Sequence, residues 1–232
     1  MSDVLEVEDL HVSIGGSHVL QGVSLAVPKG GVTALLGRNG VGKTTTLRAL
    51  LALSPRTGRV RIMAQDTSGW PTHRVVALGI GYVPEDRDVF AGLTVAENLR
   101  LAERSADANY DEVYSLFPEL KKRLKQRAGS LSGGQQQMLS IGRVLLNRCN
   151  LLLVDEPSKG LAPKLVSELA DALERISSET TILLVEQNLA VVSRLAQRIV
   201  ILDHGAVVHA GGVSDLHDPA VTTRHLGVSG AT

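Results

Sequence analysis

A glycine-rich loop between an apolar run and a helical stretch constrains this chain more than any other feature. The apolar run covers residues 32–36, in which Thr33 is the one polar residue. The loop Gly37–Thr44 matches the pattern G-x-x-x-x-G-K-[ST], and a helical pattern follows over residues 43–53. Glycines let the backbone curl so that successive N–H groups face inward at the positive end of the helix. Lys43 can then reach terminal phosphates and Thr44 can ligate Mg²⁺, so the loop predicts a nucleoside triphosphate site. The residues expected to bind the nucleotide are Gly37, Arg38, Asn39, Gly40, Val41, Gly42, Lys43, Thr44 and Thr45.

Two carboxylates at the end of a second apolar run favour a phosphate site over an ordinary glycine-rich turn. Residues 151–154 are apolar and lead into Asp155 and Glu156. The carboxyl ends of parallel strands face the ligand crevice, so Asp155 can hold Mg²⁺ opposite Thr44. Glu156 can orient and deprotonate a water that attacks the γ-phosphate. Taken alone such a pair is more often a solvated strand end, but together with the loop it predicts hydrolysis.

A second anion-binding pattern, Leu131–Gln135, lies between these two segments. A serine hydroxyl and glycine N–H groups at the start of a predicted helix again suit a phosphate. Because Gly37–Thr44 already binds the chain's own nucleotide, this segment suggests a nucleotide held by another subunit. A serine-capped helix explains Ser-Gly-Gly but not the whole string. The residues expected to contact the second nucleotide are Ser132, Gly133, Gly134 and Gln135.

Strand and helix patterns alternate along the chain, which favours a mostly parallel sheet with helices on its faces. Residues 5–13 and 18–27 alternate apolar and polar positions around Gly15-Gly16, which predicts an N-terminal hairpin. Residues 95–125 are charged and amphipathic, and we interpret them as a helical insertion.

Composition excludes several classes of function. The 232 residues carry 24 Lys+Arg and 24 Asp+Glu, so no global basic field exists to hold nucleic acid or an anionic membrane. The single cysteine, Cys149, cannot form an internal disulfide, and the first residues lack a secretory signal pattern, which together favour a reducing, cytoplasmic setting. The apolar runs are far shorter than the ~18 residues that a membrane span needs.

Three motifs resemble those of the ATP-binding cassette (ABC) ATPases of membrane transporters, and the likeness covers nearly the whole chain. They are Gly37–Thr44, Leu131–Gln135 and Leu151–Glu156, in this order and joined by a helical insertion. Shorter strings are similar to the smaller, LivF-like ATPase subunit of branched-chain amino-acid importers and of their urea- and amide-importing relatives. These strings are Gly81–Phe90, Leu131–Gln137, Ser158–Pro163 and Leu184–Asn188.

The resemblance implies an α/β fold of the P-loop NTPase (RecA-like) type with an N-terminal antiparallel β subdomain and a helical subdomain. One ABC ATPase domain is expected over residues 1–232. Its core is expected at residues 1–84 and 148–232, and the helical subdomain, which carries Leu131–Gln135, at residues 85–147.

The resemblance also implies how such a chain works. Two cassettes sandwich two ATP molecules head to tail, so Ser132 and Gly134 touch the γ-phosphate held by the partner, and Ser158–Pro163 crosses the interface. ATP and Mg²⁺ are the expected cofactors. The second ABC ATPase subunit is either a copy of this chain or a related chain.

By the same resemblance, ATP hydrolysis to ADP and phosphate drives import of branched-chain amino acids or a related small polar solute. Multi-span membrane permease subunits and, indirectly, a solute-binding protein are the expected further partners, and no nucleic acid is expected. The implied location is cytoplasmic, peripheral on the cytoplasmic face of the inner or plasma membrane.

A soluble, non-transport ABC ATPase that acts on DNA or ribosomes is the alternative function. Forms of that kind carry long coiled coils, zinc modules or two cassettes, which do not fit 232 residues, one cysteine and one set of motifs. A P-loop kinase or GTPase leaves Leu131–Gln135 unexplained. A non-hydrolysing binding module is disfavoured by the intact Asp155-Glu156 pair.

Three positions depart from the broad cassette pattern. Glu85 replaces a glutamine; it can still act as a metal or water ligand that senses Mg²⁺ and assists catalysis. Gln187 replaces a histidine and can donate a hydrogen bond to the γ-phosphate but cannot become cationic. The narrower family carries both substitutions, so activity is expected. Ile14 stands where an aromatic ring commonly stacks on adenine, which predicts nucleotide contact with weaker base selectivity.

Two other features have both a structural and a functional interpretation. Cys149 is expected to be a small core or partly exposed residue and not a nucleophile, because the sequence places no histidine partner beside it. Phe90 and Leu93 are apolar residues in a polar loop, and they form either a docking surface for the membrane subunits or plain core.

Overall fold

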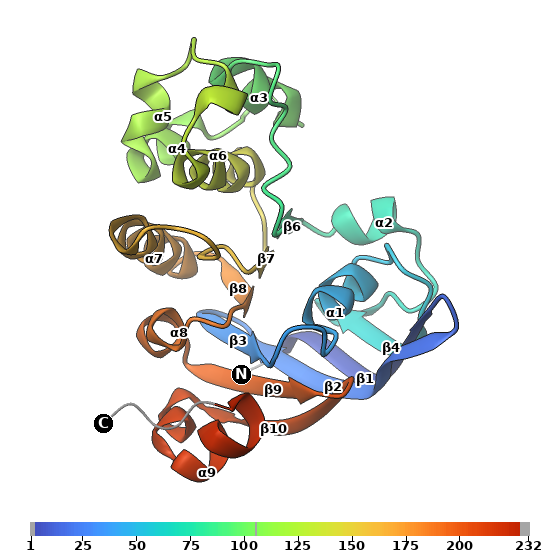
Figure 1. Cartoon of the computed structure of the whole chain (residues 1–232). Coiled ribbons are helices and arrows are strands. Elements are labelled where there is room, and N and C mark those ends of the chain that lie inside the picture. Colours follow the sequence, from blue (N-terminus) through green and yellow to red (C-terminus); the bar gives the residue numbers. More distant parts are fainter. Residues whose placement is uncertain (1–2, 105, 228–232) are drawn as a thin grey trace.

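Two sheets form the centre of the computed structural model, which describes residues 3–104 and 106–227 (Figure 1). The antiparallel sheet has the strand order β2-β1-β4-β5. Its strands are β1 (Asp3–Ile14), β2 (Ser17–Pro28), β4 (Thr57–Ile62) and β5 (Gln65–Asp66). The β1–β2 connection turns at Gly15 and Gly16, both with positive φ, so the predicted N-terminal hairpin is confirmed.

The second sheet has six strands in the order β10-β9-β3-β8-β7-β6. They are β3 (Val32–Leu36), β6 (Ile80–Val83), β7 (Leu151–Asp155), β8 (Thr181–Val185), β9 (Arg198–Asp203) and β10 (Ala206–Gly212). Every neighbouring pair is parallel except β9 and β10, which form a hairpin. The prediction of a mostly parallel sheet is therefore confirmed.

The central strands β3, β7 and β8 are buried along their whole length. Their side chains alternate between two cores, as the period of two in a strand requires. Leu36 and Val154 face one core together with the helices α3 to α8, whereas Leu35 and Leu153 face the other core together with α1 and the antiparallel sheet. Each of these strands is accordingly apolar at four of its five positions, without the alternation of a strand that has one exposed face.

Nine α-helices lie in the described part of the chain. They are α1 (Lys43–Leu50), α2 (Thr72–Val76), α3 (Val95–Ala102), α4 (Tyr110–Leu116), α5 (Pro118–Lys122), α6 (Gly133–Leu145), α7 (Pro163–Ser177), α8 (Leu189–Leu195) and α9 (Pro219–Val221). The helix expected over residues 43–53 ends at Leu50, and Ala52 has a positive φ. The helical insertion at 95–125 consists of three short helices, because Asn109 caps α4 and Pro118 starts α5.

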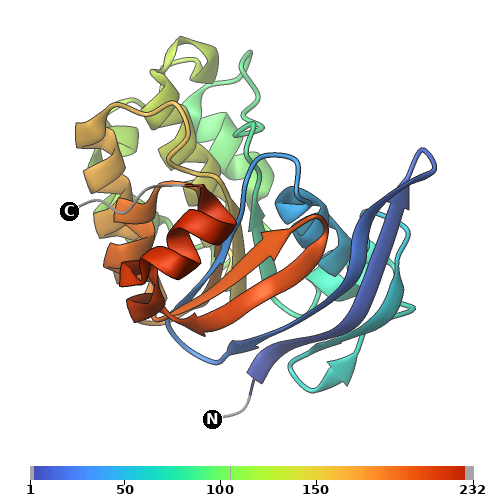
Figure 2. The ribbon, with the colours of Figure 1, turned by 60° about the horizontal axis from the view of Figure 1, so that its bottom comes forward.

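The two sheets meet where the β9–β10 hairpin lies beside β2 (Figure 2). The backbone N–H of Gln21 donates to the carbonyl of Gly205 at 2.8 Å, and the Gln21 side chain donates to the His204 carbonyl at 3.2 Å. The contact places the start of β2 next to the carboxyl end of β9, close to the loop between β3 and α1.

Within residues 3–104 and 106–227, no helix combines the length and the apolar character that a bilayer crossing requires.

Candidate functional site

The predicted phosphate loop connects β3 to α1 and depends on its glycines. Gly37, Gly40 and Gly42 have φ values of 148°, 81° and 107°, in the region that favours glycine. A Cβ on Gly42 would lie 2.6 Å from Cδ2 of Leu20, and a Cβ on Gly37 would lie 2.8 Å from a methyl group of Val41. The first turn of α1 contains no acidic residue. The positive end of this helix therefore faces the loop without a competing carboxylate of its own.

Lys43 lies folded inside the loop, with only 4% of its side chain exposed. Its Nζ donates to the carbonyl oxygens of Gly37 at 2.9 Å and Arg38 at 3.0 Å, and it lies 3.2 Å from Oε1 of Glu156. Three donors on an ammonium group thus meet three oxygens of the chain. The contact brings together the cation and the carboxylate that the sequence predicted for phosphate binding and for water activation.

Asp155, the last residue of β7, is wholly buried. Its Oδ2 lies 3.5 Å from the Tyr82 hydroxyl, and its Oδ1 has no hydrogen-bond partner among the described residues. Burial and, to a lesser degree, the charges of Glu85 and Glu156 raise the pKa of this carboxyl to about 6, while the Thr44 hydroxyl and the Lys43 charge act in the opposite direction. An unpaired buried carboxylate oxygen next to a threonine hydroxyl is a donor set that suits a hard cation, so these residues fit Mg²⁺.

Glu156 adopts a left-handed backbone conformation, with φ of 42°, directly after β7. Its Oε1 accepts a hydrogen bond of 2.5 Å from Nε2 of Gln187, and the same Nε2 lies 2.5 Å from Oδ1 of Asn39. Gln187 therefore links the phosphate loop to Glu156, across separations of 148 and 31 residues in sequence. A non-glycine residue held at positive φ next to such contacts is typical of functional sites.

Glu85 follows β6 and binds Lys159. Hydrogen bonding and charge from Glu85 raise the pKa of Lys159, whose Nζ also lies 3.8 Å from Oε2 of Glu156. Lys159 therefore balances the two carboxylates at this edge of the sheet. The sequence pattern predicted no separate role for Lys159, although this residue lies in the segment Ser158–Pro163.

A cavity of about 300 Å³ brings together eight of the predicted residues. Its lining includes Val19 and Lys159, which were not predicted, and the predicted residues Asn39, Gly40, Gly42, Lys43, Thr44, Thr45, Glu85 and Glu156. Gly37, Arg38 and Gln187 line an adjoining cavity of about 430 Å³ instead. Ile14 lies at the exposed end of β1, 52% exposed and outside both linings, so its contact with a base stays a prediction.

The segment Leu131–Gln135 lies apart from this cavity, at the start of α6 among the green and olive helices of Figure 1. Ser132 and Gln135 form a capping box: the Gln135 N–H donates to the Ser132 hydroxyl at 3.3 Å, and the Ser132 N–H donates to the Gln135 side chain at 3.0 Å. A Cβ on Gly134 would lie 2.5 Å from Leu165, and one on Gly133 would lie 3.0 Å from the Arg87 guanidinium. Within one chain, the two predicted anion sites are therefore separate.

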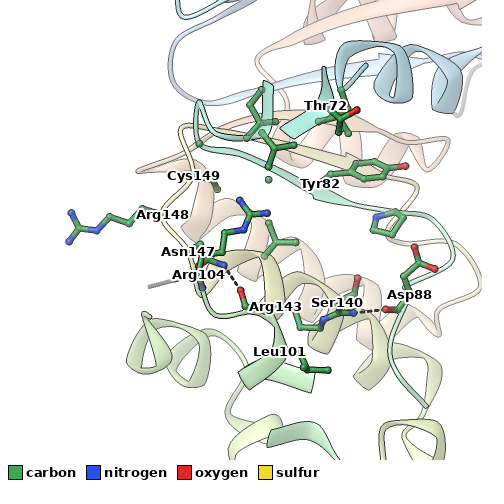
Figure 3. Close-up of a pocket in the computed structure, with 18 of the residues that line it drawn as sticks. Thr72, Tyr82, Asp88, Leu101, Arg104, Ser140, Arg143, Asn147, Arg148 and Cys149 are labelled. Atoms are coloured by element: carbon green, nitrogen blue, oxygen red, sulfur yellow. Dashed lines mark hydrogen bonds between the residues drawn. The ribbon is translucent and has the colours of Figure 1, made fainter. Parts of the chain in front are cut away.

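A further cavity of about 450 Å³ lies between α2, β6, α3 and α6 (Figure 3). Arg143 from α6 donates to the Asp88 carbonyl at its rim and lies 4.8 Å from the ring centre of Phe90. Phe90 is 49% exposed, so its interpretation as plain core is wrong. Cys149 lines this cavity, and burial raises the pKa of its thiol to about 11, which leaves it protonated and unreactive at neutral pH.

The fold and the site define a P-loop nucleotide-binding protein, with the glycine loop, Lys43 and the Asp155-Glu156 pair at the carboxyl edge of a parallel sheet. The family described as "ABC transporter" matches residues 20–159, which include all three motifs. The chain belongs to the ABC transporter family and is one of its ATPases.

The relatives of known sequence agree on this assignment. The chain is 40% identical to the high-affinity branched-chain amino acid transport ATP-binding protein BraG of Pseudomonas aeruginosa, over 97% of this chain and 100% of that protein. It is 35% identical to the probable branched-chain amino acid transport ATP-binding protein LivF of Archaeoglobus fulgidus, over 86% of this chain and 88% of that protein. It is 30% identical to the high-affinity branched-chain amino acid transport ATP-binding protein BraF of P. aeruginosa, over 97% of this chain and 98% of that protein.

Among solved structures, a nucleotide-free ATP-binding cassette from an ABC transporter covers 100% of both chains with a TM-score of 0.86 at 22% identity. A cassette in its ADP conformation gives a TM-score of 0.81 at 23% identity, over 98% of this chain and 100% of the other. The expected P-loop NTPase fold with an antiparallel β subdomain is thereby confirmed.

Proposed function

We propose that this chain is the ATP-hydrolysing subunit of an ABC importer for branched-chain amino acids or a related small polar solute. The observation that supports hydrolysis is that Lys43 and Gln187 contact the same carboxylate oxygen of Glu156, at 3.2 and 2.5 Å. Glu156 directly follows Asp155 and lines the same cavity as Thr44. The solute class is supported by the full-length similarity to BraG.

In this proposal the loop N–H groups and Lys43 bind the phosphates, and Thr44 and Asp155 hold Mg²⁺. Bound there, Mg²⁺ supplies positive charge that neutralises the phosphates and offsets the nearby carboxylates. Glu156 accepts the proton of the attacking water, and the Gln187 amide fixes the orientation of the Glu156 carboxylate. Glu85, held by Lys159, borders the metal side of the cavity.

The second nucleotide contact comes from another ATPase subunit. Ser132, Gly133, Gly134 and Gln135 are proposed to meet the γ-phosphate of the partner, because they lie outside the chain's own cavity. BraG and BraF of P. aeruginosa are two ATP-binding proteins, which supports a pair of related chains as well as a pair of copies. In either case the specific ATPase activity is expected to fall on dilution, as subunits separate. Full activity of well-diluted monomers would contradict a shared site.

We further propose that residues 85–147 act as the helical subdomain and that the cavity of Figure 3 receives a cytoplasmic segment of the multi-span permease subunits. The exposed apolar side chains of Phe90 and Leu101, 49% and 61% exposed, support a docking surface here. This docking would hold the chain at the cytoplasmic face of the membrane.

The proposal is tested first on Glu156. Glu156→Gln keeps the shape of the side chain but removes the base, so ATP binding is expected to persist while hydrolysis falls by a factor on the order of 10² or more. Glu174→Gln, which changes a side chain 60% exposed on α7, is the matched control and is expected to hydrolyse ATP normally. Retained turnover in Glu156→Gln would remove Glu156 from the mechanism.

The transport part is tested separately. Co-purification with multi-span membrane proteins is expected, and deletion of the gene is expected to abolish uptake of one solute among leucine, urea and short amides. A chain that instead co-purifies with ribosomes, or whose ATPase responds to DNA, would support the soluble alternative.

A further inference from the structure

A buried carboxylate outside the proposed reaction lies directly behind the catalytic contacts. Glu186 follows β8, and only 2% of its surface is exposed. Its Oε1 accepts the N–H of Ser158 at 3.0 Å, and its Oε2 accepts the N–H groups of Gln187 at 2.9 Å and Asn188 at 3.0 Å. Each oxygen therefore serves a different segment of the chain.

The two segments are the loop that follows β7, which contains Glu156 and Ser158, and the loop that follows β8, which contains Gln187. Ser158 begins the stretch Ser158–Pro163, two residues after Glu156. Gln187 carries the amide that donates to Glu156 at 2.5 Å. The loops are also joined at their base, because the Glu156 N–H donates to the Val185 carbonyl at 2.9 Å. Glu186 is a further connection between the two loops, besides the Gln187 amide and this backbone bond.

A local turn does not account for this arrangement. A carboxylate that caps the next two N–H groups of its own chain explains the contacts to Gln187 and Asn188. It does not explain Ser158, which lies 28 residues away in sequence and belongs to another strand end. The Ser158 contact therefore requires a role that reaches across the two loops.

Burial makes the connection stiff. A buried N–H group that loses its acceptor pays the cost of desolvation, so the loop at Ser158 cannot move away from Glu186 without finding another partner. Movement of that loop therefore pulls on the carboxylate, and through its other oxygen on the backbone of Gln187. The side chain of Gln187 in turn sets the position of Glu156.

We propose that Glu186 is a positioning residue that couples the segment Ser158–Pro163 to the Gln187–Glu156 contact. The inference rests on the proposed function, in which Glu156 and Gln187 act on the γ-phosphate. In a paired ATPase, this coupling makes the position of the Glu156 carboxylate depend on the position of the segment Ser158–Pro163.

Two variants of the full-length chain separate the two halves of the connection. Glu186→Gln retains one acceptor oxygen, which can keep the paired contacts to Gln187 and Asn188 and then presents an NH₂ group to the Ser158 N–H. Glu186→Ala removes all three contacts. We expect kcat to fall about fivefold in Glu186→Gln and about twentyfold or more in Glu186→Ala, with the Kd for MgATP within about threefold of wild type.

Glu97→Gln is the matched control. Glu97 also accepts a backbone N–H bond, from Thr94 at 2.7 Å, but it does so in the capping box of α3. Its kcat is expected to equal that of wild type. Amide hydrogen exchange supplies a readout independent of activity: exchange at Ser158 is expected to quicken in both Glu186 variants, and exchange at Gln187 and Asn188 only in Glu186→Ala.

Two results would overturn the proposal. One is a kcat within twofold of wild type in both variants; the other is a kcat that falls together with MgATP affinity while exchange at Ser158 is unchanged. If Glu186→Ala does not fold, Glu186→Gln decides alone. If wild type itself fails to hydrolyse ATP, the proposed function fails, and the exchange experiment then overturns or retains the Glu186 connection by itself.

Discussion

Asp155→Asn is expected to make the Mg²⁺-free, nucleotide-free protein more stable at neutral pH while abolishing its activity. The carboxyl of Asp155 is wholly buried, and its pKa is raised from the ordinary 3.8 to about 6, first by burial and then by the charges of Glu85 and Glu156. Ionising it in the folded protein therefore costs free energy that ionising it in the unfolded chain does not.

The sign and size follow from linkage. Between pH 3.8 and about 6 the folded state binds the proton and the unfolded state does not, so raising the pH through this window removes stability. At 1.36 kcal/mol per pKa unit, the roughly two-unit shift corresponds to about 3 kcal/mol above pH 6. Asparagine has nearly the same shape as aspartate and no charge. The Asp155→Asn variant is therefore expected to have a higher free energy of unfolding than wild type at pH 7.5, and nearly the same free energy of unfolding at pH 4.

The assay is urea unfolding followed by circular dichroism, at pH 4.5 and pH 7.5, in buffer with a chelator. Asp155→Asn is expected to exceed wild type by about 1 to 3 kcal/mol at pH 7.5 and by much less at pH 4.5. Asp171→Asn, at an exposed position of α7, is the control and is expected to show no such pH-dependent gain. Equal stability of Asp155→Asn and wild type at pH 7.5 would refute the argument that the buried, ionised Asp155 carboxylate destabilises the folded state.

Three other perturbations test the fold and the nucleotide site. Gly42→Ala places a Cβ 2.6 Å from Leu20 at a residue with φ of 107°. ATP binding, measured by calorimetry, is expected to be lost, and the free energy of unfolding, measured by thermal denaturation, is expected to fall by about 1–3 kcal/mol. Leu139→Ala, in the fully buried face of α6, is expected to cost about 2–5 kcal/mol in urea unfolding, whereas Leu101→Ala at a 61% exposed position is expected to cost under about 0.5 kcal/mol. Ile14→Tyr supplies a ring for stacking at an exposed position, so ATP affinity is expected to rise relative to GTP by about 1 kcal/mol or more in competition binding; unchanged affinities for both nucleotides would end that interpretation.

Local features of this chain were predictable where neighbouring residues decide the conformation. The loop Gly37–Thr44 joins a strand to a helix as expected, because its glycines alone permit the required φ values. The fully apolar run 151–154 is a strand covered on both faces, as its lack of alternation indicated. Three helices, α3, α4 and α5, lie within the range 95–125 that was expected to be a helical insertion. Their division at Asn109 and Pro118 was not predicted, since capping and a proline act against an otherwise continuous periodic pattern.

Residue types and motif order thus identified the components of the site: the phosphate loop, the acidic strand end, the serine-glycine segment and the family to which they belong. Only the tertiary structure decided their contacts, such as Gln187 between Asn39 and Glu156, Lys159 beside Glu85, and Glu186 across two loops. Gln187 meets Asn39 and Glu156 because β8 lies between β3 and β7 in the sheet, although these three strands are far apart in the sequence. The strand order depends on burying both faces of the whole sheet, and this condition cannot be read from any single segment of the sequence.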